Sequence, residues 1–300
     1  MNLNRISNFK KSLSIIQHII TRKIDDIKYK NIPQVPQVTK NAIKIMEDEI
    51  KAVCGETKVR YIEITPDKYR DFEKMLGFEH IYHKRLWNRY ERKISEYYLA
   101  AHLLNIQEGK GIYIDVASQN SPWAEWCNLH SEYQAYALDI EHPRNVGAKH
   151  FICADATHMP FKDNSIDAMS LQSALETFFG NDDINFIKEC GRVLRGGGKV
   201  VIAPLYLNTS YCNLYGKSYF EDAVEEEEAS KYLRLDFDMP FTRLYDVKNL
   251  KKRLLDTASE VGLDYSIYVV DSKQTLYDKK DTFIYLHFAL LLEKKGTVQK

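Results

Sequence analysis

The chain has few cysteines, no long apolar run and no net charge, and each absence removes a class of protein. Its five cysteines stand at scattered positions without a paired spacing: Cys54, Cys127, Cys153, Cys190 and Cys212. This pattern argues against a zinc site and against a disulfide framework. No apolar run is long enough to span a bilayer. Reduced thiols and the lack of a signal peptide predict a cytoplasmic protein.

Charge is balanced overall but unevenly distributed along the chain. The sequence holds 42 basic and 42 acidic residues, which disfavours a protein that grips nucleic acid through its phosphates. Residues 1–95 nevertheless carry 20 basic and 12 acidic residues. This basic part either docks on the acidic remainder or meets an anionic partner. The histidines are spread singly, and nothing in their spacing requires a metal.

The amino-terminal third reads as mainly helical. Apolar residues from Ile6 to Ile27 recur every three or four positions and predict a basic amphipathic helix over residues 3–28. Such a helix packs on its own core or on a second subunit, or it binds a membrane surface or a partner. After an extended link at 33–38, the patterns predict helices near 43–53 and 66–77, a strand at 59–64 and a long helix over 86–106.

Strand and helix patterns alternate over the rest of the chain. Strands are expected at 112–116, 135–139, 150–153, 166–172 and 199–204, and a last pair near 264–270 and 282–293 is expected to form an antiparallel edge. Helices are expected at 121–131, 181–194 and 246–261. This alternation predicts an α/β fold with a parallel sheet covered on both faces. A ligand should then lie beyond the carboxyl ends of the strands.

Three motifs mark this region. The first runs from Gly111 through the apolar Ile112–Val116 to a small polar loop and the helix start Ser121-Pro122. The second is Asp155-Ala156-Thr157-His158-Met159-Pro160-Phe161-Lys162-Asp163-Asn164-Ser165-Ile166-Asp167, and the third runs from Glu189 to Pro204 through the turn Gly196-Gly197-Gly198. Together they resemble the S-adenosylmethionine-dependent methyltransferases of the Rossmann-like class, closest to the branch that methylates small molecules such as quinones, sterols and sugars.

The resemblance implies a fold, a division into domains and a cofactor. The fold would be a seven-stranded, mostly parallel, Rossmann-like sheet with an α-rich amino-terminal extension. Residues 1–95 would form the extension, as a substrate cap or an oligomerisation element, and residues 96–300 the S-adenosylmethionine-binding domain. An aromatic-rich insertion at 206–244 would cap the acceptor. The partners would be a small-molecule acceptor and, in a homodimer, a second copy of the chain.

The cofactor residues follow from the positions of the motifs. Asp139 would accept from both ribose hydroxyls, and Asp155 from the adenine amino group, with the Ala156 N–H donating to the ring. The full expected set is Asp115, Ala117, Ser118, Asn120, Asp139, Ile140, Asp155, Ala156 and Gln172. The family usually has glycines where this chain has Ala117, Gln119 and Ser121. Asp163 and Asp167 are expected to organise the following turn and strand.

The acceptor side is expected beside the fourth strand and the insertion. Glu176 is the candidate catalytic base, which would take a proton from a hydroxyl or an amine, although a capping or salt-bridged role suits it equally. Tyr206, Tyr211 and Arg243 are the candidate substrate-binding residues. His83 is a weaker candidate from the amino-terminal part.

Two other functions compete with methyl transfer to a small molecule or a glycan-like acceptor. The glycine-poor loop favours a non-catalytic partner subunit that keeps the fold but binds nucleoside weakly or not at all. The basic helices favour a nucleic-acid methyltransferase, against which the neutral total charge and the tyrosine-rich insertion argue.

Deletion of residues 1–30 tests the expected division of labour. We expect the shortened protein to lose acceptor use or assembly while it keeps its affinity for the cofactor. Calorimetry with S-adenosylmethionine and sedimentation of both forms measure the two properties. An equal loss of both would contradict the division.

Overall fold

The computed structural model describes residues 28–32, 38–78, 87–118, 121–141, 150–235, 237–271 and 286–296. The expected helix at 3–28 lies almost wholly outside this range. Residues 33–37 of the expected link at 33–38 also lie outside it, as do His83, Gln119 and Asn120.

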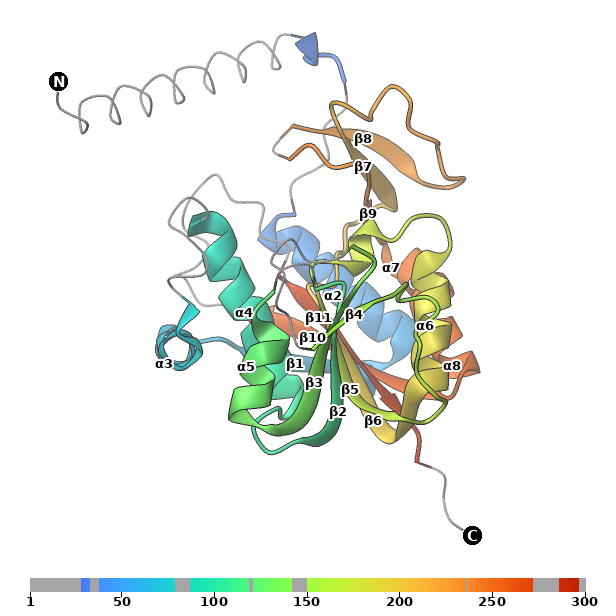
Figure 1. Ribbon diagram of the computed structural model, residues 1–300. Helices are drawn as coiled ribbons and strands as arrows, with labels where there is room; N and C mark the ends of the chain where they lie inside the picture. The colour runs from blue at the N-terminus through green and yellow to red at the C-terminus, as the bar shows by residue number, and fades with distance from the viewer. Residues whose placement is uncertain are drawn as a thin grey trace, which may run out of the picture.

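An eight-stranded sheet forms the centre of the molecule (Figure 1). Its strands are β1 (Val59–Glu63), β2 (Lys110–Val116), β3 (Glu132–Asp139), β4 (Phe151–Cys153), β5 (Ile166–Gln172), β6 (Leu194–Ala203), β10 (Leu263–Asp271) and β11 (Phe288–Lys294). Their order is β1-β10-β11-β6-β5-β2-β3-β4, and only β11 pairs antiparallel to its neighbours. The mixed α/β fold with a mostly parallel sheet is therefore confirmed.

The eighth strand comes from the amino-terminal part of the chain. β1 pairs in parallel with β10, from Val59 opposite Ile267 to Glu63 opposite Asp271. The expected sheet had seven strands, with the β10–β11 pair as its edge. That edge assignment was wrong, because β1 covers β10 on its outer side. The division at residue 95 remains a prediction, although β1 belongs to the central sheet.

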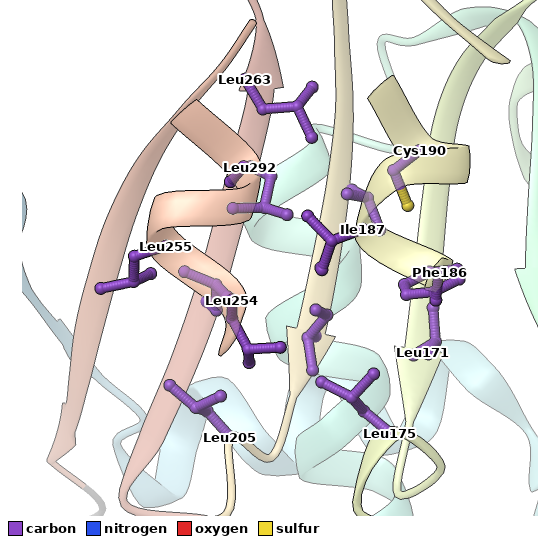
Figure 2. Close-up of a cluster of buried hydrophobic side chains, with 14 of the residues drawn as sticks. Leu171, Leu175, Phe186, Ile187, Cys190, Leu205, Leu254, Leu255, Leu263 and Leu292 are labelled. Atoms are coloured by element: carbon purple, nitrogen blue, oxygen red, sulfur yellow. The ribbon is translucent and has the colours of Figure 1, made fainter. Parts of the chain in front are cut away.

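Helices cover both faces of the sheet (Figure 1). One face carries α3 (Pro66–Leu76), α4 (Trp87–Leu104) and α5 (Trp123–His130); the other carries α2 (Lys40–Cys54), α6 (Asp182–Val193) and the segment from α7 (Val247–Leu250) to α8 (Asp256–Glu260). Figure 2 shows the second face, where Phe186 and Ile187 of α6 lie across from Leu254. Burial of a large aliphatic or aromatic side chain stabilises by about 1.5–3 kcal/mol, so both layers hold the sheet.

Two expected elements differ in detail from the structure. β6 begins at Leu194, so the glycine turn lies inside the strand, where the register with β5 shifts between Ile166 and Ala168. A side chain at Gly198 would lie 2.9 Å from the Ile166 carbonyl oxygen; glycine therefore allows this close approach. The expected helix at 246–261 contains a π-helical turn, η5 (Lys251–Leu255).

The insertion forms a small sheet of its own above the main one (Figure 1). Its strands are β7 (Cys212–Gly216), β8 (Ser230–Arg234) and β9 (Thr242–Leu244), in the order β8-β7-β9. Arg243 of β9 is wholly buried and reaches the loop after β5, where it donates to the carbonyl oxygens of Phe178 at 3.0 Å and Gly180 at 2.9 Å. It also pairs with Asp183 at 3.0 Å and with Glu226. These contacts fix the insertion over the carboxyl end of β5.

No helix among the described residues is long and apolar enough to cross a membrane.

Replacement of Arg243 by Met tests this attachment. We expect a loss of about 3 kcal/mol in unfolding free energy, because removal of one partner leaves buried carboxylates and carbonyls without their donor. Urea unfolding followed by tryptophan fluorescence measures it. Arg70→Met, which breaks the exposed pair with Asp67, is the matched control and should change little. Equal stability of both variants would show that the buried pair does not anchor the insertion.

Candidate functional site

The expected cofactor residues lie along one edge of the sheet. In the parallel register Asp115 of β2 stands opposite Ala137 of β3 and Ser170 of β5, and Asp139 stands opposite Cys153 of β4. The Ala154 N–H donates to the Asp139 carbonyl oxygen at 2.9 Å, which brings Asp155 beside the end of β3. Asp115, Asp139, Asp155 and Gln172 therefore all lie at the carboxyl ends of neighbouring strands.

Asp115 is a buried carboxylate with few hydrogen-bond donors around it among the described residues. Its side chain is 0% exposed, neither carboxylate oxygen has a hydrogen bond of good geometry within the described chain, and the Ser121 hydroxyl lies beside it. Burial raises its pKa to about 7 and the charge of Asp139 adds to the rise, whereas the Ser121 hydroxyl and the Lys93 ammonium oppose it. A buried acceptor left without a donor is costly and marks a site that a ligand can complete.

The loop after β2 is strained where the family usually carries glycine. Ala117 has φ +52°, in the left-handed region where a Cβ costs about 1–2 kcal/mol. Ser118 is buried, its N–H donates to the Leu138 carbonyl oxygen at 3.2 Å, and its hydroxyl has no partner among the described residues. The chain thus keeps the backbone shape of a glycine loop and adds a hydroxyl to it. Asn120 lies outside the described residues.

The Asp139 and Asp155 carboxylates differ in burial and in hydrogen bonding. Asp139 is buried and accepts from the Glu141 N–H at 2.9 Å, and the next residue, Ile140, is 71% exposed. Asp155 is exposed, and its Oδ1 accepts from the Thr157 N–H at 2.7 Å and from the Thr157 hydroxyl at 2.8 Å. The neighbouring Ala156 is buried.

Two residues that the sequence did not single out for a role brace the Asp155 segment. Glu189 of α6 accepts from the Met159 N–H at 2.7 Å. Arg192 donates to the carbonyl oxygens of Met159 at 3.0 Å and Phe161 at 2.7 Å, and it pairs with Asp163 at 2.7 Å. The link spans about 30 residues of sequence, so no local pattern indicated it.

Asp163 and Asp167 have the expected structural contacts. Asp163 pairs with Arg192. Asp167 accepts from the Ile112 N–H at 2.6 Å and pairs with Arg195. Both therefore organise the turn and strand around them.

Gln172 faces the interior. Its side-chain amide donates to the Ser170 hydroxyl at 2.5 Å, and Ser170 is bonded in turn to the Tyr113 hydroxyl. The backbone carbonyl oxygen of Gln172 accepts from the Lys93 ammonium at 2.9 Å. The residue thus joins the β5 end to α4, and its contact with a cofactor remains a prediction.

Glu176 lies in a buried polar cluster between α4 and the end of β5. It belongs to the 3-10 turn η4 (Leu175–Thr177) and is 6% exposed, and its Oε2 has no hydrogen-bond partner among the described residues. Burial raises its pKa to about 7; the charge of Glu96 adds to the rise, and the charges of Arg92 and Lys93 oppose it. Tyr206 is also buried, and burial, with the nearby charge of Glu176, raises its pKa.

The other two expected substrate residues lie elsewhere. The Tyr211 hydroxyl donates to Glu226 Oε2 at 2.8 Å. Tyr211 lines a hollow of about 280 Å³ together with Gly180, Asn181, Glu226, Glu227, Glu228, Asn249, Lys252 and Arg253. Arg243 is bonded to carbonyls and carboxylates as described above. The structure thus brings Tyr206 to Glu176 but places Tyr211 and Arg243 in a separate group, and their roles in substrate binding remain predictions.

Comparison with known proteins assigns the region that carries these acids. Residues 105–202 match the family model described as a methyltransferase domain. This segment is a methyltransferase domain of the Rossmann-like, S-adenosylmethionine-dependent class. S-adenosylmethionine is the cofactor of that class. The matched segment begins just after α4 and ends within β6, so it contains Asp115, Asp139, Asp155 and Glu176.

One curated relative is the demethylmenaquinone methyltransferase of Thermotoga maritima. It is 26% identical over 157 residues, which cover 50% of this chain and 64% of the relative. The chain therefore spans less than two thirds of that relative's length.

Two solved structures match the chain distantly. The 1,6-didemethyltoxoflavin-N1-methyltransferase of Burkholderia thailandensis, with 1,6-didemethyltoxoflavin and S-adenosylhomocysteine, superposes with a TM-score of 0.46 at 10% identity, over 80% of this chain and 94% of that one. Phosphoethanolamine N-methyltransferase 2 of Haemonchus contortus, with S-adenosyl-L-methionine, has a TM-score of 0.44 at 13% identity, over 84% and 60%.

The residues of the methyltransferase domain fit the cofactor of its class. Neither the Asp115 carboxylate nor the Ser118 hydroxyl has a hydrogen bond of good geometry among the described residues, and an amino-acid end carrying an ammonium supplies donors. Asp139 and Asp155 follow the neighbouring strands β3 and β4, and their carboxylates are acceptors of the kind that ribose hydroxyls and an adenine amino group need. Ala117 already holds the backbone in the shape that close approach requires.

Asp115→Asn tests the cost of the buried acid. Burial raises the pKa of Asp115, so the folded state keeps a proton that the unfolded state releases between pH 4 and 7. The unfolding free energy therefore falls by about 4 kcal/mol as the pH rises from about 4 to about 7. Asparagine cannot ionise, so we expect D115N to equal the parent near pH 4 and to be more stable at pH 8.

Urea unfolding of the ligand-free protein at pH 4.5, 6 and 8 measures this difference. Asp67→Asn, at an exposed aspartate, is the control and should follow the parent at every pH. Parallel curves for D115N and the parent would contradict a raised pKa for Asp115.

Proposed function

We propose that this chain moves a methyl group from S-adenosylmethionine to a small-molecule or glycan-like acceptor. The main support is the gathering of Asp115, Asp139 and Asp155 at one sheet edge, inside the segment that matches the methyltransferase domain. This edge is where ligands of open α/β sheets bind.

The cofactor contacts follow from the chemistry of the three acids. Asp139 accepts from the ribose hydroxyls and Asp155 from the adenine amino group, with Ile140 against the base. Asp115 and the Ser118 hydroxyl bind the amino-acid end, whose ammonium stabilises Asp115 as a carboxylate. When bound, the cofactor supplies an electrophilic methyl group on a sulfonium.

The acceptor-side chemistry falls to Glu176. With its pKa raised to about 7 by burial, Glu176 is well matched to accept a proton from a hydroxyl or an amine near neutral pH. Tyr206 bounds the same cluster. In-line displacement disperses positive charge, so the protein mainly has to align donor and acceptor and exclude water. The insertion, fixed over the carboxyl end of β5, is suited to that exclusion.

The amino-terminal part completes the acceptor pocket or a homodimer interface in this proposal. α4 already reaches Gln172 through Lys93. The cysteines of the described chain are free, in keeping with a cytoplasmic location.

A non-catalytic partner subunit is the second candidate, and the glycine-poor loop favours it. The two candidates differ in one property, because only the enzyme must bind the cofactor with useful affinity.

Titration with S-adenosylhomocysteine, the stable product, separates them. We expect saturable heat from the parent protein and at least a tenfold weaker affinity from Asp155→Asn, since that change removes a charged acceptor of a hydrogen bond. Asp163→Asn is the matched control, because Asp163 is in the same segment and pairs with Arg192 instead. It should keep the parent affinity.

Two outcomes would count against the enzyme. Absence of heat and of a thermal shift at millimolar S-adenosylhomocysteine would support the partner subunit. Equal weakening by D155N and D163N would show that the Asp155 segment acts only through its fold.

A further inference from the structure

A strained turn joins β5 to the 3-10 turn that carries Glu176. Ser173 has φ +55°, an uncommon conformation for a residue with a side chain. Its N–H donates to the Ala203 carbonyl oxygen at 3.2 Å, which fixes the turn to β6. Such strain persists only where surrounding contacts over-determine it, and it gathers at functional sites.

Two side chains of α4 also contact this turn, in addition to the Tyr206 hydroxyl, which bonds Ser173. The Lys93 ammonium donates to the Gln172 carbonyl oxygen at 2.9 Å. The Ser173 hydroxyl donates to Glu96 Oε1 at 2.7 Å. Lys93 and Glu96 also pair with each other at 2.8 Å, and Glu96 is 0% exposed. The two members of one ion pair therefore bond the adjacent residues Gln172 and Ser173, which lie 79 and 77 residues further along the chain.

The charges of the same ion pair act on the Glu176 carboxyl. The charged or titratable groups around Glu176 are Arg92, Lys93 and Glu96 of α4 and Tyr206 after β6. Lys93 also acts on Asp115, the acid of the cofactor side. A single ammonium thus lies within electrostatic reach of both the cofactor acid and the acceptor-side acid.

We propose that the Lys93–Glu96 pair of α4 positions Glu176, by holding the Ser173 turn in its strained form and by setting the charge around the carboxyl. Lys93 and Glu96 are positioning residues, and the name acceptor-side base for Glu176 rests on the proposed function. Burial is the main reason that the pKa of Glu176 lies near neutral pH, and the two charges adjust it: Lys93 favours the carboxylate and Glu96 favours the protonated form.

Carboxyl titration in the ligand-free protein tests the electrostatic part. Glutamate labelled with ¹³C at the carboxyl carbon reports each side chain by NMR, and Glu176→Gln identifies the Glu176 signal. Lys93→Met should raise the pKa of Glu176 by about one pH unit or more, Glu96→Gln should lower it by a similar amount, and Lys93→Arg should restore the parent value. Glu108→Gln, in the loop that precedes β2, is the control.

The opposite signs distinguish positioning from simple structural damage. Collapse of the turn would expose Glu176 and move its pKa toward the ordinary value in both variants. A shift in the same direction for K93M and E96Q, or no shift in either, would overturn the proposal.

Two variants at Ser173 test the strain, and this test does not depend on whether K93M folds. Ser173→Ala and Ser173→Gly both lose the hydroxyl bond to Glu96, but only glycine relieves the positive φ. We expect S173G to melt at a higher temperature than S173A. The reverse order, which the entropy of glycine alone would give, would show that the turn is not strained and would overturn the proposal.

These measurements stand apart from the proposed function. They need neither cofactor nor acceptor, so a protein that fails to bind S-adenosylhomocysteine can still show the opposite shifts. In that case the positioning would hold and the methyl transfer would not.

Discussion

The parallel register of β5, β2, β3 and β4 is the constraint on which the site depends. Hydrogen bonds between these strands set Asp115 against Ala137 and Ser170, and Asp139 against Cys153. Because parallel strands end at the same edge, residues far apart in sequence are forced to share one row. Successive side chains point to opposite faces, so a slip of one residue would turn each acid to the other face of the sheet. The apolar layers on both faces hold the register, and the chemistry is built on it.

Two buried acids with incomplete hydrogen bonding are the energetic cost of this arrangement. Asp115 and Glu176 are both nearly or wholly inaccessible, and burial raises the pKa of each to about 7. A fold selected for stability alone would replace them with neutral groups. Their presence indicates that the ligand-free protein is poised to be completed by a positively charged or proton-donating ligand. A substrate with a sulfonium and an ammonium at one end meets that description.

Helix and strand positions could be predicted from local patterns in the sequence, whereas contacts between distant segments could not. The strand at 166–172 and the helix at 66–76 were expected almost to the residue, since alternation, Pro66 and Gly77 mark them. The acids at the strand ends followed from their motifs. Three sets of contacts join segments about 30 to 200 residues apart, and no periodicity encodes them. They are the pairing of β1 with β10, the bonds of Glu189 and Arg192 to the Asp155 segment, and the bonds of Lys93 to Gln172 and of Ser173 to Glu96.

The position of β1 has a practical consequence for any shortened form of the protein. Its backbone satisfies the outer hydrogen-bonding row of β10 from Ile267 to Asp271, a strand that carries Val269 and Val270 as well. A recombinant fragment beginning near residue 96 would leave that row bare. An unpaired apolar strand is a template for strands of other molecules, so such a fragment would expose a new edge at which copies can pair.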